Sequence, residues 1–157
     1  MKYDAEKLLD DLKTICQASL NTRLAAIDAE KGDGSTPQLD NEAYFFQDML
    51  HERAPAYDVL MLYGLQDPTT EAMYGATAEN HEIYFIVVVK ETAELDAVQR
   101  RMMRYTRALK EVFERDFSNI RCPCKLLVSG LAPTRIKPEG VSGAWLTAGV
   151  KINTTLA

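Results

Sequence analysis

Apolar residues recur every three or four positions between residues 4 and 31, which places them on one face of a helix. The spacing therefore predicts a long amphipathic helix over this segment. Asp4 stands at its start and can accept hydrogen bonds from free backbone N–H groups of the first turn. Gly32 follows it and can adopt the left-handed conformation that ends helices at little cost. The apolar positions of this predicted helix are Leu8, Leu12, Ile15, Cys16, Leu20, Leu24 and Ile27.

A second helical pattern covers residues 92 to about 117 and shows the same spacing with greater regularity. Thr92 is placed to cap this helix, and Glu94 and Asp96 put negative charge at the positive end of the helix dipole. We expect the helix to bury the face formed by Leu95, Val98, Met102, Tyr105, Leu109, Val112 and Phe113.

Four runs rich in apolar, β-branched and aromatic residues predict strands. The second run is apolar almost throughout, which is typical of a central strand covered on both faces. In the last run Val150 and Ile152 alternate with Lys151 and Asn153, so one face of that strand should be buried. The four runs cover residues 57–63, 82–89, 125–129 and 144–153.

Turn-forming residues separate these elements and predict the loops. Residues 32–37 are a cluster of such residues, whereas residues 39–55 fit neither period well and are interpreted as a short helix. Long loops are expected near residues 67–80 and 131–142, each joining two strands. A compact domain seldom keeps such loops without a function, so we expect them to reach neighbouring molecules and become ordered on assembly.

The order of the predicted elements is α-β-β-α-β-β. Because hairpins join neighbouring strands, we expect an α+β fold with an antiparallel sheet of about four strands and the two main helices packed on one face. The 157 residues suit a single domain, 1–157. With 46% hydrophobic and 26% charged residues, the composition is that of a globular chain.

Charge and hydropathy narrow the class of protein further. The first residues are charged and lack the apolar core of a secretory signal, so export by that route is not expected. The longest apolar run, residues 83–89, is too short for a bilayer span of about 20 residues, so no membrane partner is expected. The net charge of -5 argues against binding driven by neutralisation of nucleic-acid phosphates. The sparse cysteines Cys16, Cys122 and Cys124 indicate a reducing compartment.

Residue types that support catalysis or metal binding occur in unfavourable patterns. Cys122 and Cys124 could form a metal clip, but zinc usually needs a second pair, so a helix-to-strand turn is the simpler interpretation. His51 and His81 each precede a glutamate, but sequence neighbours face opposite sides of an extended chain, so ordinary surface histidines are expected. There is no glycine-rich phosphate loop and no nucleophile elbow. The sequence therefore predicts no enzyme, no catalytic residue, no cofactor and no metal.

Basic residues form a row along the polar side of the second predicted helix, because helix periodicity aligns positions 100, 104 and 107. The row is either a solvated face, balanced by Glu111 and Glu114, or a surface that docks an acidic patch of a neighbouring subunit. Arg135 and Lys137 add positive charge on the second predicted long loop. The candidate subunit-interface residues are therefore Arg100, Arg104, Arg107, Arg135 and Lys137.

Four segments carry a family resemblance: the helix at residues 4–31, the strand at 81–90, the helix containing 104–109, and the closing strand at 149–154. Their arrangement resembles the ring-forming tail terminator and related neck proteins of tailed phages. Those proteins are small α+β subunits with a long first helix and a hairpin sheet crossed by a second helix. The resemblance covers most of the chain.

The resemblance implies a structural virion protein of the neck or tail, synthesised in the host cytoplasm. It implies a homo-oligomeric ring, typically six-fold, that caps the tail tube and joins it to the head connector while DNA passes through the lumen. An acidic subunit suits such a lumen, because a surface that repels phosphate lets the duplex slide. The alternatives are a head-completion or minor capsid protein, and a small cytoplasmic ligand-binding domain or enzyme.

Overall fold

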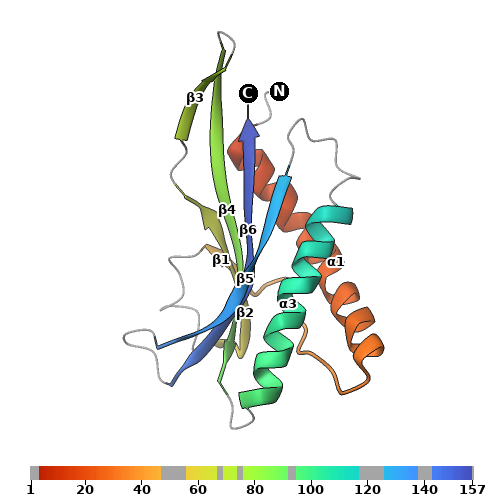
Figure 1. Cartoon of the computed structure of the whole chain (residues 1–157). Helices are drawn as coiled ribbons and strands as arrows, with labels where there is room; N and C mark the ends of the chain where they lie inside the picture. Colours follow the sequence, from red (N-terminus) through yellow and green to blue (C-terminus); the bar gives the residue numbers. More distant parts are fainter. Residues whose placement is uncertain are drawn as a thin grey trace.

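The computed structural model describes residues 4–46, 56–66, 69–73, 76–91, 95–116, 126–137 and 143–156. Within these residues the chain forms two helices and one sheet of six strands, an α+β fold. Figure 1 shows a tall, twisted sheet with both helices running along it. In chain order the elements are α1 (Ala5–Lys31), β1 (Tyr44–Phe46), β2 (Val59–Leu65), β3 (Thr69–Met73), β4 (Ala76–Lys90), α3 (Leu95–Arg115), β5 (Leu126–Ile136) and β6 (Trp145–Leu156).

Helix α1 begins and ends as predicted. The Asp4 carboxylate accepts a hydrogen bond from the backbone N–H of Lys7 at 2.9 Å, so Asp4 is the N-cap. Gly32 has a φ of 68°, and its N–H donates to the carbonyl of Asp28 at 2.9 Å. The predicted apolar face is buried except for Ile15, which is partly buried.

Helix α3 confirms the second helical prediction within the described residues. Asp96 lies in its first turn, where it faces the positive end of the dipole. The predicted cap, Thr92, lies outside the described residues, as does Glu94. The apolar positions Val98, Met102, Tyr105, Leu109, Val112 and Phe113 are all buried.

The sheet is mixed and larger than the predicted antiparallel sheet of about four strands. Its strands lie in the order β1-β2-β4-β6-β5, and β3 pairs with one end of β4. Among the strands that the structure describes, only β1 and β2 pair in parallel, with Tyr44 opposite Met61 and Phe46 opposite Tyr63. The predicted order α-β-β-α-β-β was therefore wrong, because two short strands were not recognised.

Strand β1 occupies part of the segment that was predicted as a short helix. Its three residues are aromatic, which favours a strand, but three residues are too few to show an alternating pattern. Residues 47–55 of the predicted short helix lie outside the described residues.

The predicted loop near residues 67–80 is largely a β-hairpin. Strand β3 pairs with β4 from Thr69 opposite Asn80 to Met73 opposite Ala76. As a result β4 is 15 residues long and begins before the predicted strand 82–89. The segment is rich in threonine, which favours strands, but it lacks the hydrophobic alternation on which the prediction depended. Residues 67, 68, 74 and 75 lie outside the described residues.

The predicted loop near residues 131–142 is also partly strand. Strand β5 continues to Ile136, past a register shift between Leu131 and Thr134. Pro133 falls within this bulge, where a strand tolerates a residue without a backbone N–H. The proline made the predicted strand end too early. Residues 138–142 lie outside the described residues.

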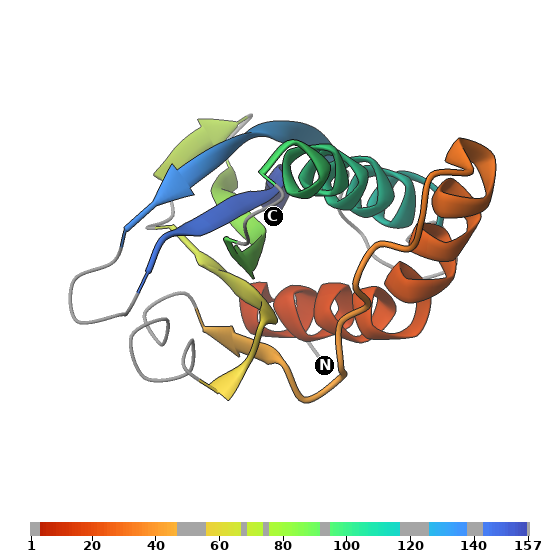
Figure 2. The ribbon, with the colours of Figure 1, turned by 90° about the horizontal axis from the view of Figure 1, so that it is seen from below.

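Both helices pack on one face of the sheet, as predicted, and Figure 2 shows them along the same side of it. The main hydrophobic core lies between these layers. Strands β4 and β6 contribute alternate residues to it, which confirms the predicted buried face of the last strand. These residues include Ile83, Phe85, Val87, Val150 and Ile152.

A smaller apolar cluster lies on the opposite face, at one end of the sheet. Leu60, Leu62, Val88 and Trp145 are buried in it. Since Val87 belongs to the main core and Val88 to this cluster, β4 is buried on both faces here. The prediction of a central strand from the apolar run is confirmed.

Candidate functional site: the contact between the helices and the borders of the sheet

Arg104 lies inside the contact between α1 and α3. Its side chain is only 7% exposed. Its Nη1 donates to Oδ1 of Asp28 at 2.9 Å, and its Nη2 donates to the carboxylate of Asp33. Asp28 is on α1 and Asp33 is in the loop that follows, so one guanidinium joins three segments of the chain. The prediction that Arg104 belongs to an outward-facing basic row was wrong.

Asp28 anchors the loop that leaves α1. Its carboxylate accepts hydrogen bonds from the backbone N–H and the hydroxyl of Thr36, both at 2.6 Å. Burial acts to raise the pKa of Asp28, but the bonds from Thr36 and Arg104 outweigh it and hold the pKa below its ordinary value. The pKa of Asp33 is lowered chiefly by its hydrogen bond with Arg104. Arg104 therefore faces two ionised carboxylates at neutral pH.

Two further contacts hold the same loop against the helices. The hydroxyl of Tyr105 on α3 donates to the carbonyl of Pro37, and burial raises the pKa of this phenol. The side chain of Asn21 on α1 donates to the carbonyl of Leu39 at 2.8 Å and accepts from its N–H at 3.0 Å. The loop predicted from its turn-forming residues is thus fixed to both helices.

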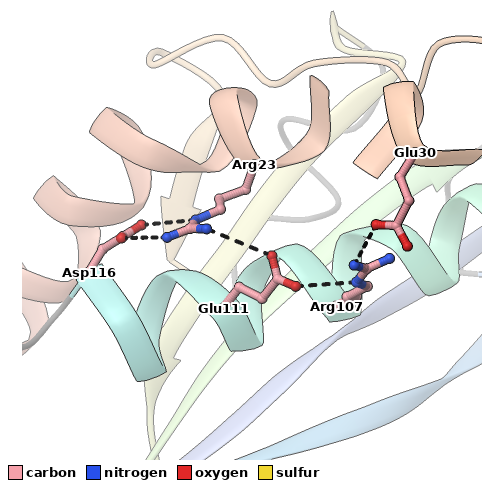
Figure 3. Close-up of polar contacts among 5 residues, drawn as sticks. All are labelled: Arg23, Glu30, Arg107, Glu111 and Asp116. Atoms are coloured by element: carbon pink, nitrogen blue, oxygen red, sulfur yellow. Dashed lines mark hydrogen bonds and ion pairs between the residues drawn. The ribbon is translucent and has the colours of Figure 1, made fainter. Parts of the chain in front are cut away.

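A chain of five side chains with alternating charge also joins the two helices, as Figure 3 shows. Arg23 on α1 lies 2.7 Å from Asp116 and 4.0 Å from Glu111. Glu111 also accepts from Nε of Arg107 at 3.2 Å, and Nη2 of Arg107 reaches Glu30 on α1 at 2.7 Å. Arg107 is therefore engaged within the subunit. Its pair with Glu111 belongs to the interpretation of a balanced, solvated face, whereas its contact with Glu30 on α1 was not predicted.

Surface hollows lie where α3 begins beside the end of α1. One has a volume of about 320 Å³ and is lined by Asp33, Asp96, Ala97, Arg100, Arg101 and Arg104. A second, of about 330 Å³, is lined by Ile27, Lys31, Asp33, Arg100, Met103, Arg104 and Arg107. The structure thus brings together the predicted interface residues Arg100, Arg104 and Arg107. Among these, Arg100 is exposed.

Arg135 and Lys137 lie at the far end of β5. Arg135 forms a two-point ion pair with Glu91, which follows β4, with Nε at 2.7 Å and Nη2 at 3.1 Å from the carboxylate oxygens. Its side chain nevertheless stays 65% exposed. Arg135 lies in a strand and not in the predicted loop, whereas Lys137 is exposed directly after that strand.

Strand β5 forms one border of the sheet, since within the described chain it pairs only with β6. No residue of this strand is fully buried, and Leu127 is 67% exposed. Residues 126–134 carry no charged side chain. Proteins usually protect such a border with charged residues, proline or a bulge. Here only the later part of β5 has those features.

Hydroxyl groups cover the backbone of β5 around its bulge. Thr106 on α3 donates to the carbonyl of Leu131 at 3.3 Å, and Thr134 donates to the carbonyl of Ala132 at 3.2 Å. The carbonyl of Thr134 accepts in turn from the hydroxyl of Thr147 at 3.3 Å. This part of the border is therefore satisfied within the subunit.

The first part of β5 presents every second residue's backbone groups outward, because these groups alternate in direction along an antiparallel strand. The N–H of Glu91, which follows β4, donates to the carbonyl of Ala144, so even-numbered residues of β6 bond to β4 and odd-numbered residues bond to β5. Leu127 and Ser129 lie opposite Asn153 and Lys151 and therefore bond to β6. The N–H and C=O groups of Leu126, Val128 and Gly130 point away from β6. We call residues 126–130 the open edge.

The hairpin of β3 and β4 projects beyond the other strands, as Figure 1 shows at the top of the sheet. Strand β6 ends opposite Glu79, so residues 76–78 of β4 pair with β3 alone. At Asn80, β3 pairs on one side of β4 and β6 on the other. We call β3 together with residues 76–78 the arm. The arm and the open edge therefore lie on opposite borders of the sheet.

Among the histidines and cysteines that the sequence singled out, the structure describes His81 and Cys16. His81 is buried, contrary to the prediction, and its Nε2 lies 3.1 Å from the carboxylate of Glu79. His51, Cys122 and Cys124 lie outside the described residues. Within the described part of the chain, no group of three or more His, Cys, Asp or Glu side chains is placed to hold a metal ion.

Cys16 is buried, as predicted, with Sγ 3.6 Å from the hydroxyl of Tyr44. Burial raises the pKa of this thiol to about 12, so it stays protonated and unreactive at neutral pH. Neither helix in the described residues is long and apolar enough to span a bilayer.

Comparison of the sequence with protein-family models finds no matching family, and comparison with curated proteins finds no match. Functional inference therefore depends on the surfaces described above.

Proposed function

We propose that this chain is a structural subunit of a phage particle, a ring-forming tail terminator or neck protein that joins the tail tube to the head connector. The observation that carries the proposal is the open edge, an uncharged strand border whose Leu127 side chain is 67% exposed. A protein that stays single must protect such an edge against pairing, whereas a subunit covers it on assembly.

The layout of the elements supports the same proposal. The family resemblance implies a long first helix and a hairpin sheet crossed by a second helix. Here α1 has 27 residues, and α3 packs across β5 and β6. The hairpin strands β5 and β6 pair along most of their length.

The sheet face opposite the helices has a polar half that suits contacts with adjoining structural proteins. Tyr84 donates to Glu82 at 3.1 Å, Lys151 lies 3.9 Å from Glu82, and Thr155 donates to Asn80 at 2.7 Å. These side chains give that half of the face hydroxyl, amide and charged groups for polar contacts. The proposed partners are other copies of this chain, the tail tube and the connector.

In such a ring DNA passes through the lumen without sequence-specific binding. The chain has 23 acidic and 18 basic residues. In addition, Arg104 and Arg107 are paired within the subunit and are less available to phosphate. A subunit of this charge favours sliding of the duplex over retention.

The test is the native mass of the purified full-length chain, together with negative-stain electron microscopy. The expected result is a closed ring with an open centre, typically of six copies. A chain that stays monomeric at high concentration would contradict the proposal. Antibody labelling of assembled particles then separates the neck or tail terminator from the head-completion and minor capsid alternatives, because the neck predicts label at the head–tail junction.

The hollows beside Arg100 favour one competing function, a small domain that binds an anionic metabolite. Four arginines and Lys31 border them, but Asp33 is shared by both hollows and offsets part of this charge. A monomer that binds such a metabolite, and loses it in the Arg100→Met variant, would favour this alternative over the ring.

A further inference from the structure

We propose that the arm of one copy pairs with the open edge of the next copy, so that one sheet continues across the boundary between subunits. This inference rests on the proposed ring function and states how the copies join. The surface is a strand border, and its partner is a strand from a second copy of this chain.

The open edge offers backbone groups that a further strand can use. Val128 and Gly130 direct their N–H and C=O groups away from β6, while the neighbouring Leu131 carbonyl is already bound by Thr106. The pairing surface is therefore bounded at one end by the contact with α3. Its length, residues 126–130, equals the five residues of β3.

The arm needs a packing partner that the rest of its own chain does not provide within the described residues. Residues 76–78 of β4 have β3 on one side and no strand on the other. A two-stranded hairpin by itself is marginally stable in water. Pairing with a third strand would satisfy the outer backbone groups of β3, so assembly stabilises the arm.

A second copy of this chain is a suitable partner, because each copy carries both the arm and the open edge. The arm lies on one side of the sheet and β5 on the other. Contacts between two different surfaces are head-to-tail, and they close into a ring when the rotation between copies allows it. Pairing of β5 with β5 would instead give a closed dimer and leave both arms without a partner.

Length and charge favour β3 over the other border strand as the donor. Strand β1 has three residues, fewer than the open edge, whereas β3 has five. The sequence of β3, Thr-Thr-Glu-Ala-Met, contains β-branched residues and one charge. The open edge has no charged side chain, so nothing in the two segments repels pairing.

Site-specific cross-linking tests this pairing in the full chain. Cys122 and Cys124 are changed to serine, and buried Cys16 is kept. Two variants that each add one cysteine, Thr70→Cys on the arm and Ser129→Cys on the open edge, are mixed, reassembled and treated with a short bis-maleimide. The expected product is a covalent dimer in the mixture, with little in either variant alone. Dimers from Ser129→Cys alone would show β5–β5 pairing and overturn the inference.

A backbone variant gives an independent measurement. Val128→Pro removes one outward N–H while leaving the hydrogen bonds to β6 in place, so the fold should persist but self-association should weaken at least about tenfold. Val128→Ala keeps that N–H and removes most of the same side chain, so it is the matched control. Circular dichroism reports the fold and sedimentation reports the oligomer. If Val128→Pro does not fold, the cross-linking result decides.

The outcomes separate this inference from the proposed function. Intact rings of folded Val128→Pro would overturn the pairing and leave the ring function standing. Rings assembled from the two cysteine variants without a cross-link between arm and open edge would do the same. A wild-type chain that never forms an oligomer would overturn both. Rings whose copies cross-link from Thr70→Cys to Ser129→Cys support both.

Discussion

Arg104 Nη1 lies 2.9 Å from Asp28 Oδ1, and both side chains are nearly out of solvent, at 7% and 12% exposure. The pair joins α3 to α1 across 76 positions of sequence. A charged group in such a contact must be paired, since an uncompensated buried charge is costly. The pair therefore fixes how α3 is placed over β5 and β6, and with it the shape of the border that the proposed assembly uses.

The first prediction removes the charge of Arg104. Arg104→Met should lower the free energy of unfolding by roughly 3 kcal/mol, because Asp28 is left buried without its cation. Urea denaturation followed by circular dichroism measures the change. The control is Arg100→Met, one helical turn away and exposed, which should change stability by less than about 0.5 kcal/mol. Equal losses in the two variants would contradict the role assigned to Arg104.

The second prediction concerns acid. The pKa values of Asp28 and Asp33 are lower in the folded chain than the ordinary value of 3.8. The unfolded chain therefore takes up protons first as the pH falls. The stability that these two ionised carboxylates contribute is complete well above pH 3.8. It is lost as the pH falls through their lower pKa values in the folded chain.

The matched measurement compares wild type with Arg104→Met at about pH 7 and about pH 3. Wild type should lose more free energy of unfolding between these conditions, since the variant lacks the hydrogen bonds by which Arg104 lowers both pKa values. Losses of the same size would show that Arg104 does not set the acid response.

Periodicity was sufficient to predict both helices, because each buries a stripe of the kind that a single helix face requires. It did not reveal the role of Arg104. This residue lies two positions after Met102 and next to Tyr105, so it was interpreted as part of the polar side. The end of α1 and the loop that follows it pack against that side, and their carboxylates Asp28 and Asp33 are far away in the sequence. Single-helix patterns contain no information about such a neighbour.

The strands show a similar limit. Strand β4 was recognised as central from its apolar residues, because a strand that is buried on both faces is apolar along most of its length. The hydrophobic pattern of a strand does not show which strands lie beside it, so the border position of β5 could not be predicted. Strand β3 was missed because its sequence, Thr-Thr-Glu-Ala-Met, lacks the hydrophobic alternation that predicts a strand. The arm and the open edge, which we propose to mediate assembly, are thus the parts of the fold that the hydrophobic pattern predicts least well.

The third prediction tests the chain of charges between the helices. Glu111 is shared by Arg23 and Arg107, and its side chain is 19% exposed. Glu111→Gln should cost about 1 kcal/mol of stability at low salt and less at high salt, because ions screen pairs near the surface. Glu114 on the same helix is exposed and supplies the control. Glu114→Gln should leave the unfolding midpoint unchanged, and a loss equal to that of Glu111→Gln would argue against the network.

The fourth prediction concerns Gly149, where β6 approaches β4 most tightly. A Cβ at this position would overlap the carbonyl oxygen of Phe85 and lie 2.9 Å from Cα of Ile86. These are backbone atoms inside a pairing that runs from Glu79 to Lys90 of β4, so they cannot move without breaking the ladder. Gly149→Ala should therefore destabilise the fold by about 3 kcal/mol or more, measured by thermal denaturation.

Gly130 on β5 supplies the matched control for that substitution. A Cβ there would meet only side-chain atoms, Cγ2 of Thr106 at 3.0 Å and Cδ of Lys110 at 3.6 Å. Such atoms can shift by rotation, so Gly130→Ala should cost less than about 1 kcal/mol and should still allow rings to form. Since both variants add one methyl group to a strand, the difference between them isolates the backbone contact. Equal melting temperatures would mean that β4 and β6 are not held as closely as the register of the sheet requires.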